Sequence, residues 1–170
     1  MSSYRYQVLQ EILRALKQDV SFLPEPGDKC DGIKPDSIIF RKVSVRLRPI
    51  NEGHTFDPVF PGIVVSTPFE EPFNPSAGEV AHDEYIYHFL IQIIDSDNWE
   101  PTADIQSYWK WQEQVRRLFQ FNCMSNVDSP HVLAKAVNVD VVDETKWLKD
   151  QNFVCGVHVA VQVWETRGPT

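Results

Sequence analysis

Tyr85-Ile86-Tyr87-His88-Phe89-Leu90-Ile91-Gln92-Ile93-Ile94 is a strongly apolar run around which we expect the rest of the chain to be organised. Its odd-numbered side chains share one face of an extended chain, and most of the even-numbered ones are apolar too. It therefore predicts a central strand over residues 83–94 that is covered on both faces. A polar turn at residues 95–98 and a long amphipathic segment follow. We interpret residues 83–121 as a central strand that delivers the chain into the main helix.

Two segments show the spacing of amphipathic helices. Residues 4–20 carry apolar side chains at three- and four-residue steps, and Pro24 follows them. The same spacing in residues 101–121 predicts the second helix. Pro101 is compatible with it, because a proline is tolerated in the first turn of a helix. The side chains expected to pack from this helix are Ile105, Tyr108, Trp109, Val115, Leu118 and Phe119.

The remaining strands are predicted from alternation and from short apolar runs. We expect them at residues 38–48, 62–66, 132–142 and 153–164, and the last two are expected to form an antiparallel hairpin. The element order is then α-β-β-β-α-β-β. This order predicts an α+β fold, with a mainly antiparallel or mixed sheet of about five strands flanked by two helices. Residues 1–170 are expected to form a single domain.

Long loops are predicted at residues 24–36, 50–61 and 67–82, and the tail at residues 165–170 is prone to disorder. The third loop carries Pro68, Pro72, Pro75 and Gly78, so we expect no regular structure in it. It also carries Phe69 and Phe73. A loop of this length without structure of its own is usually functional or mobile.

Charge is segregated along the chain. The net charge of −8 argues against a protein that binds nucleic acid by neutralising phosphates. Residues 49–109 contain no Lys or Arg but include Glu70, Glu71, Glu79, Asp83 and Glu84. A basic cluster precedes this span and consists of Arg41, Lys42, Arg46 and Arg48. Such asymmetry concerns surfaces and partners rather than the fold.

Motifs of known chemistries are missing from the sequence. No glycine-rich phosphate loop or nucleophile elbow is present. His82 and His88 would lie about 20 Å apart along an extended strand, too far to share a metal ion. The three cysteines are far apart and fit reduced structural thiols. We therefore expect no catalytic, cofactor-binding or metal-binding residues.

Localisation follows from two absences in the sequence. No apolar run reaches the roughly 18 residues that a membrane span needs. The first residues lack the apolar region of a signal peptide, so we expect synthesis in the cytosol.

The charge pattern predicts a contact between copies of the chain. The basic strand of one subunit, through Arg41, Lys42, Arg46 and Arg48, would meet the acidic middle segment of the next, and a head-to-tail contact of this kind can close into a ring. Phe69 and Phe73 would anchor this contact. Two alternatives stay open for the basic face, namely contact with nucleic acid and plain solvation. An alternative for Phe69 and Phe73 is that they pack against the core of their own subunit.

Several segments together resemble a known protein family. They are the helix at residues 4–20, Val43-Ser44-Val45-Arg46-Leu47-Arg48-Pro49, Pro61-Gly62-Ile63-Val64-Val65-Ser66, the strand that ends in Asp95-Ser96-Asp97-Asn98, and Trp111-Gln112-Glu113-Gln114-Val115-Arg116-Arg117-Leu118-Phe119. In order and texture the chain resembles the tail-terminator or tail-completion proteins of tailed bacteriophages. The resemblance covers residues 4–164.

The resemblance implies a structural virion protein without catalytic residues, made in the host cytoplasm. Such proteins form a hexameric ring that caps the tail tube and joins it to the head-side neck. The implied partners are further copies of the chain, the tail tube protein and a head-closure or adaptor protein. DNA passes through the ring without specific binding. The alternatives are another head-tail connector or minor tail protein, and a small α+β ligand-binding domain or enzyme.

Overall fold

A computed structural model describes the backbone of most of the chain. The described residues are 3–23, 32–41, 61–67, 70–72, 82–96, 101–120, 123–124, 126–127, 134–142 and 152–166. The segment that was expected to continue the basic strand, residues 42–48, lies outside these ranges.

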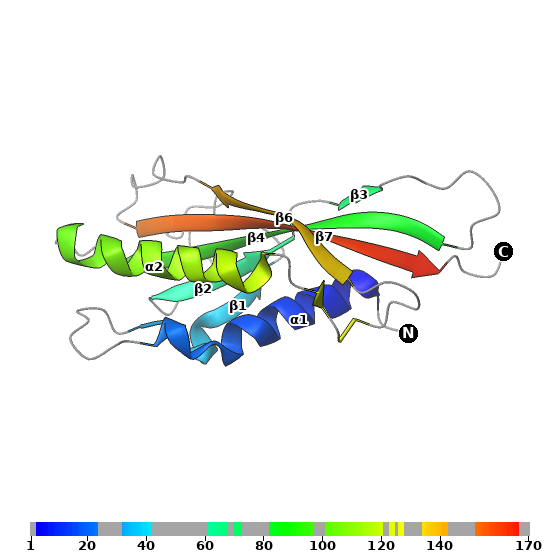
Figure 1. Cartoon of the computed structure of the whole chain (residues 1–170). Helices are drawn as coiled ribbons and strands as arrows, with labels where there is room; N and C mark the ends of the chain where they lie inside the picture. Colours follow the sequence, from blue (N-terminus) through cyan, green and yellow to red (C-terminus); the bar gives the residue numbers. More distant parts are fainter. Residues whose placement is uncertain are drawn as a thin grey trace, which may run out of the picture.

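The body of the molecule is a mixed sheet (Figure 1). Its strands run in the spatial order β1-β2-β4-β7-β6-β5, and β3 pairs with β4 beside this path. The β1–β2 pair is parallel and the other pairs are antiparallel. The strands are β1 (Ile38–Arg41), β2 (Gly62–Ser66), β3 (Glu70–Pro72), β4 (His82–Ser96), β5 (Cys123–Met124), β6 (Ala134–Val142) and β7 (Asn152–Thr166).

The antiparallel ladder between β4 and β7 forms the centre of the sheet. Both strands are 15 residues long and pair over their whole length, from His82 opposite Thr166 to Ser96 opposite Asn152. The apolar run that begins at Tyr85 supplies β4, as expected. The predicted β6–β7 hairpin pairing is confirmed, and β7 extends two residues beyond Trp164 into the segment that was expected to be a disordered tail.

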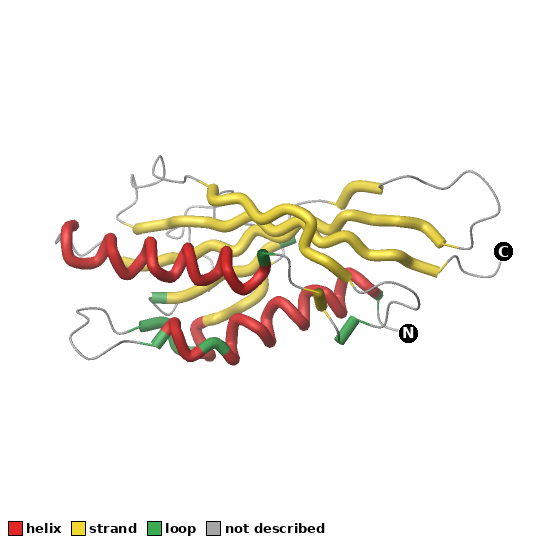
Figure 2. The backbone as a smooth tube through the Cα atoms, in the orientation of Figure 1, coloured by secondary structure: helices red, strands yellow, loops and turns green. Residues whose placement is uncertain are grey.

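Two α-helices cover one face of this sheet (Figures 1 and 2). They are α1 (Tyr4–Gln18) and α2 (Pro101–Phe119). Two short 3-10 helices, η1 (Val20–Phe22) and η2 (Pro35–Ser37), lie between α1 and β1 in the chain. The α+β fold and the order of its main elements, α-β-β-β-α-β-β, are therefore confirmed.

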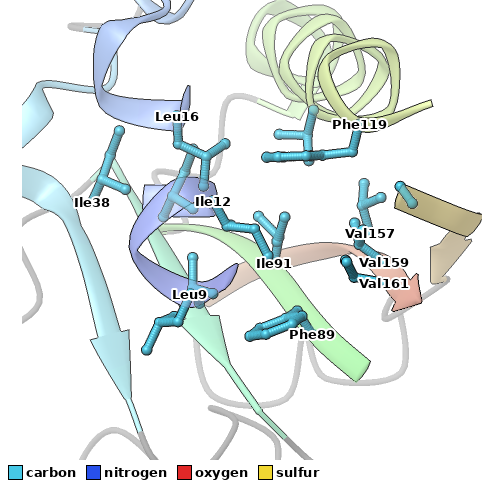
Figure 3. Packing of buried hydrophobic residues seen from close by; sticks show 14 of the residues in the cluster. Leu9, Ile12, Leu16, Ile38, Phe89, Ile91, Phe119, Val157, Val159 and Val161 are labelled. Carbon is cyan, nitrogen blue, oxygen red and sulfur yellow. The ribbon is translucent and has the colours of Figure 1, made fainter. Parts of the chain in front are cut away.

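The core lies between the helices and the odd-numbered face of β4 (Figure 3). Ile12 and Leu16 from α1 and Phe119 from α2 point toward Ile91 and the valines of β7. The β4 and β7 side chains of this face include Phe89, Ile91, Ile93, Val157, Val159, Val161 and Val163. Each of these side chains is fully buried. Burying a side chain of this size contributes about 1.5–3 kcal/mol, so this layer dominates the stability.

The opposite face of the sheet is also buried, although both α-helices lie on the first face. Val64, Leu90 and Ile94 are buried there together with the polar side chains of Gln92 and Ser66. The prediction that β4 is buried on both faces is therefore confirmed.

Several local predictions are wrong. The first helix ends at Gln18, because Asp19 adopts an extended backbone conformation. Residues 70–72 of the expected loop form β3, since an edge strand tolerates a proline such as Pro72 at its end. Trp109 does not pack into the core, and Trp111 does. Two short strands, β3 and β5, join the five longer ones.

Candidate subunit interface

The structure brings four of the predicted acidic residues to one end of the sheet. Glu70 and Glu71 lie on β3, and Asp83 and Glu84 lie on the first part of β4. The register places Glu71 opposite Ile86, only two positions from Glu84. In the sequence these residues are only near one another along the chain. The pairing of β3 with β4 places them side by side in the sheet.

β7 adds a further acidic position, which was not anticipated. Glu165 lies opposite Asp83 in the β4–β7 ladder. We call Glu70, Glu71, Asp83, Glu84 and Glu165 the acidic end of the sheet. In Figure 1, β3 and the paired ends of β4 and β7 project to one end of the molecule, away from α2.

Glu84 is the acidic-end residue whose side chain is described. It is half-buried and lies opposite Trp164 on β7. Burial raises the pKa of Glu84, because removing water disfavours the charged carboxylate. A cation brought close to Glu84 would therefore stabilise a charge that the isolated subunit solvates poorly.

Of the predicted basic cluster, the structure describes Arg41. Its side chain is exposed at the end of β1, where its backbone pairs with Ser66 of β2. The other predicted contact residues, Lys42, Arg46, Arg48, Phe69 and Phe73, lie outside the described residues, and so does Glu79. The expected strand with a basic outer face therefore stays a prediction beyond Arg41.

A second surface, on α2, was not predicted. Trp109 is 61% exposed and lines a shallow hollow of about 240 Å³ with Gln112, Glu113 and Arg116. These four residues, which we call the Trp109 surface, share one side of the helix because they are three, four and seven positions apart. Val115 and Phe119 mark the buried side of the helix. Counting about 100° per residue from these two positions would have predicted that Trp109 is exposed.

Hydrogen bonds from the side chains of Tyr108, Gln112 and Gln114 hold α2 to the rest of the molecule. The hydroxyl of Tyr108 donates to Asp95 near the end of β4, and Gln112 Nε2 donates to the carbonyl oxygen of Gly156 at 2.9 Å. Gln114 Nε2 donates to Asp19 Oδ2 at 2.8 Å. The outward face of α2 is therefore presented by a helix anchored to both β-strands and α1.

A histidine pair lies on the face of the sheet opposite the helices. His88 Nδ1 and His158 Nε2 are 2.9 Å apart, and the ring centroids are 5.0 Å apart with planes within 4°. The rings lie edge to edge in nearly one plane, because face-to-face rings with such close nitrogens would have much closer centroids. Asp140 on β6 lies opposite His158 in the register. The pair was missed because it joins strands that are distant in sequence.

The described part of the chain contains no group of three His, Cys, Asp or Glu side chains placed to hold a metal ion. A hollow of about 110 Å³ lies between the end of α1 and η2, well below the roughly 300–1,000 Å³ of typical ligand pockets. No helix in the described ranges has the length and apolar character needed to cross a bilayer.

Comparisons with known proteins give no assignment. No protein-family model matches the chain, and no curated protein matches its sequence. A function for the chain is therefore inferred from the acidic end of the sheet and from the order of the elements.

Proposed function

We propose that the chain is a structural virion protein, a tail terminator of a tailed bacteriophage. Copies of it form a ring, a hexamer in the family that it resembles, which caps the tail tube and joins it to the head-side neck. Its partners are further copies of itself, the tail tube protein and a head-closure or adaptor protein. The role needs no cofactor and no catalytic residue, and the protein is made in the host cytoplasm before it enters the virion.

The observation that carries this proposal is the acidic end of the sheet. β3, β4 and β7 gather five acidic positions there, within or beside a span of 61 residues, 49–109, that has no Lys or Arg. A ring through which DNA moves must not hold the DNA, and negative charge repels phosphates. The confirmed order of elements supports the resemblance from which the ring is inferred.

Negative-stain electron microscopy of the purified protein, alone and mixed with tail tubes, tests the proposal. We expect rings, and tubes whose growing end carries a cap with a central channel. Binding to the head-side connector while the tube end stays bare would instead identify a head-closure protein. Single particles that neither form rings nor bind tubes would overturn the proposal.

A DNA-binding measurement provides an independent test. Because the acidic end repels phosphates, the ring is expected to leave the mobility of duplex DNA unchanged at low salt. Tight binding that weakens steeply as salt is added would contradict an open, DNA-repelling channel.

A further inference from the structure

The outward face of α2 has the composition of a contact surface. Trp109 is 61% exposed, which makes it the most exposed aromatic side chain in the described residues. Exposed apolar area costs about 25 cal/mol per Å² relative to burial, so covering an indole is favourable. Tryptophan and arginine are also the residue types that most often carry binding energy at interfaces, and Arg116 lies beside Trp109 in the same hollow.

This face also carries positive charge. Glu113 is paired with Arg117, whose Nη2 lies 2.7 Å from Glu113 Oε1. Arg116 is exposed, and no ion pair within the described ranges involves it. The carboxylate beside Trp109 is therefore already neutralised, and the charge of Arg116 remains available to a partner.

The complementary charge lies on the same molecule, but at its other end. Figure 1 shows α2 along one half of the sheet, whereas β3 and the ends of β4 and β7 project from the other half. The acidic end and the Trp109 surface therefore cannot meet within one copy. A contact between two different surfaces on identical chains is heterologous, and it repeats until it closes into a ring or extends as a filament.

We propose that the Trp109 surface of one copy binds the acidic end of the sheet of a second copy. Trp109 packs against the β3–β4 edge and Arg116 pairs with Glu84, whereas the alternate positions of the ladder, Asp83 and Glu165, are left to the channel. The inference rests on the proposed ring and names the two surfaces that build it. In this contact the positive charge comes from α2 and not from the predicted basic strand that includes Arg41.

Photo-crosslinking of the full chain tests which surfaces meet. A benzophenone amino acid replaces Trp109, and in a matched control it replaces Tyr6, an aromatic residue of α1 that is 54% exposed. We expect intermolecular products from position 109 that map to residues 70–72, 82–86 or 163–166, and none to these residues from position 6. Products that map elsewhere overturn the inference, and so does the absence of an intermolecular product at the highest soluble concentration.

Charge reversal gives a second, independent readout. Arg116→Glu is expected to weaken self-association in sedimentation velocity by about tenfold or more, and Glu84→Arg in the same chain is expected to restore it. Lys17→Glu, an equal charge change on the exposed side of α1, is the control. Equal effects of Arg116→Glu and Lys17→Glu would contradict a specific contact.

The two proposals fail in different ways. Rings in micrographs without crosslinks to the acidic end would refute the α2 contact and leave the terminator role intact. Crosslinks to the acidic end without capping of tubes would show the contact in a protein that is not a terminator.

Discussion

At the scale of single residues, Asp19 joins two helices that are far apart in the chain. Its Oδ1 accepts hydrogen bonds from the backbone N–H and the hydroxyl of Ser21, and its Oδ2 accepts one from Gln114 on α2. Burial alone would raise the pKa of Asp19, but the three hydrogen bonds together lower it. The charged form of this carboxylate therefore stabilises the folded state.

Replacing Asp19 tests this stabilisation. Asp19→Ala is expected to lower the free energy of unfolding by about 1–2 kcal/mol at pH 7, because it leaves three donors without their acceptor. Since the folded-state pKa of Asp19 is lowered, its contribution is present above the ordinary value of 3.8 and is lost as the pH falls through the folded value. Urea unfolding at pH 7 and below pH 3.8 measures both effects.

Two comparisons make the Asp19 result interpretable. Asp19→Asn keeps an acceptor for Ser21 without the charge, so its difference from the wild type should shrink toward low pH. Lys17→Ala changes an exposed neighbour on α1 and should have little effect at either pH. A deficit of Asp19→Ala that stays constant with pH would show that the carboxylate's charge is irrelevant.

At the scale of elements, α2 has one buried face and one exposed face. Tyr108, Trp111, Val115 and Phe119 are buried against the sheet and α1, while Trp109 is exposed. The two tryptophans are two positions apart in one helix and lie on different sides of it. Stability and association should therefore respond to different substitutions in the same helix.

Paired substitutions on α2 separate these roles. Phe119→Ala is expected to lower the free energy of unfolding by about 3–5 kcal/mol, because it leaves a cavity in the core. Trp109→Ala should change it by less than about 0.5 kcal/mol, as for other surface substitutions. Urea unfolding followed by circular dichroism measures both. A large loss of stability in Trp109→Ala would mean that the indole packs within its own subunit.

Element boundaries show how far sequence periodicity reaches. The alternation in residues 85–94 and 153–164 predicted β4 and β7 because buried strands leave a strong apolar signal. The sequence analysis places Trp109 in the core, but three aromatic residues, Tyr108, Trp109 and Trp111, crowd one turn. At 3.6 residues per turn they cannot all face inward. The inward side of α2 is the side of Val115 and Phe119. It can be found in the sequence only by placing all residues of the helix at steps of about 100° from these two.

At the scale of the whole molecule, the acidic end of the sheet and the Trp109 surface lie toward opposite ends (Figure 1). The segregation of charge along the chain is visible in the sequence, but the arrangement of the acidic residues in space is not. The β3–β4 pairing and the arrival of Glu165 beside Asp83 depend on contacts between distant segments. The same limit applies to the histidine pair, since nothing in either strand alone specifies that His88 meets His158.

For Glu84, the raised pKa and the proposed contact predict opposite effects on the stability of the subunit and on its association. Its pKa is raised by burial, so the folded state favours the protonated form. The carboxyl's favourable contribution is complete below the ordinary pKa of 4.5 and is lost as the pH rises through the raised value. At neutral pH, Glu84→Gln is therefore expected to raise the stability of the subunit while it weakens self-association.

Thermal unfolding and sedimentation velocity at pH 7 measure the two effects of Glu84→Gln. Asp36→Asn removes the same charge from an exposed position in η2 and serves as the control. Addition of salt should narrow the difference in association between Glu84→Gln and the wild type, because screening weakens exposed charge pairs. Unchanged self-association of Glu84→Gln would exclude its carboxylate from the contact.

The central position of β7 has a consequence for synthesis of the protein on the ribosome. β4 pairs with β7 along its whole length, but α2, β5 and β6 are translated between them. Until residue 166 has emerged, the nascent chain holds a 15-residue strand with a long apolar run and one unpaired edge. Such an edge invites pairing with other chains. Translation that stalls before β7 should therefore yield aggregates or chaperone-bound chains rather than a smaller folded domain.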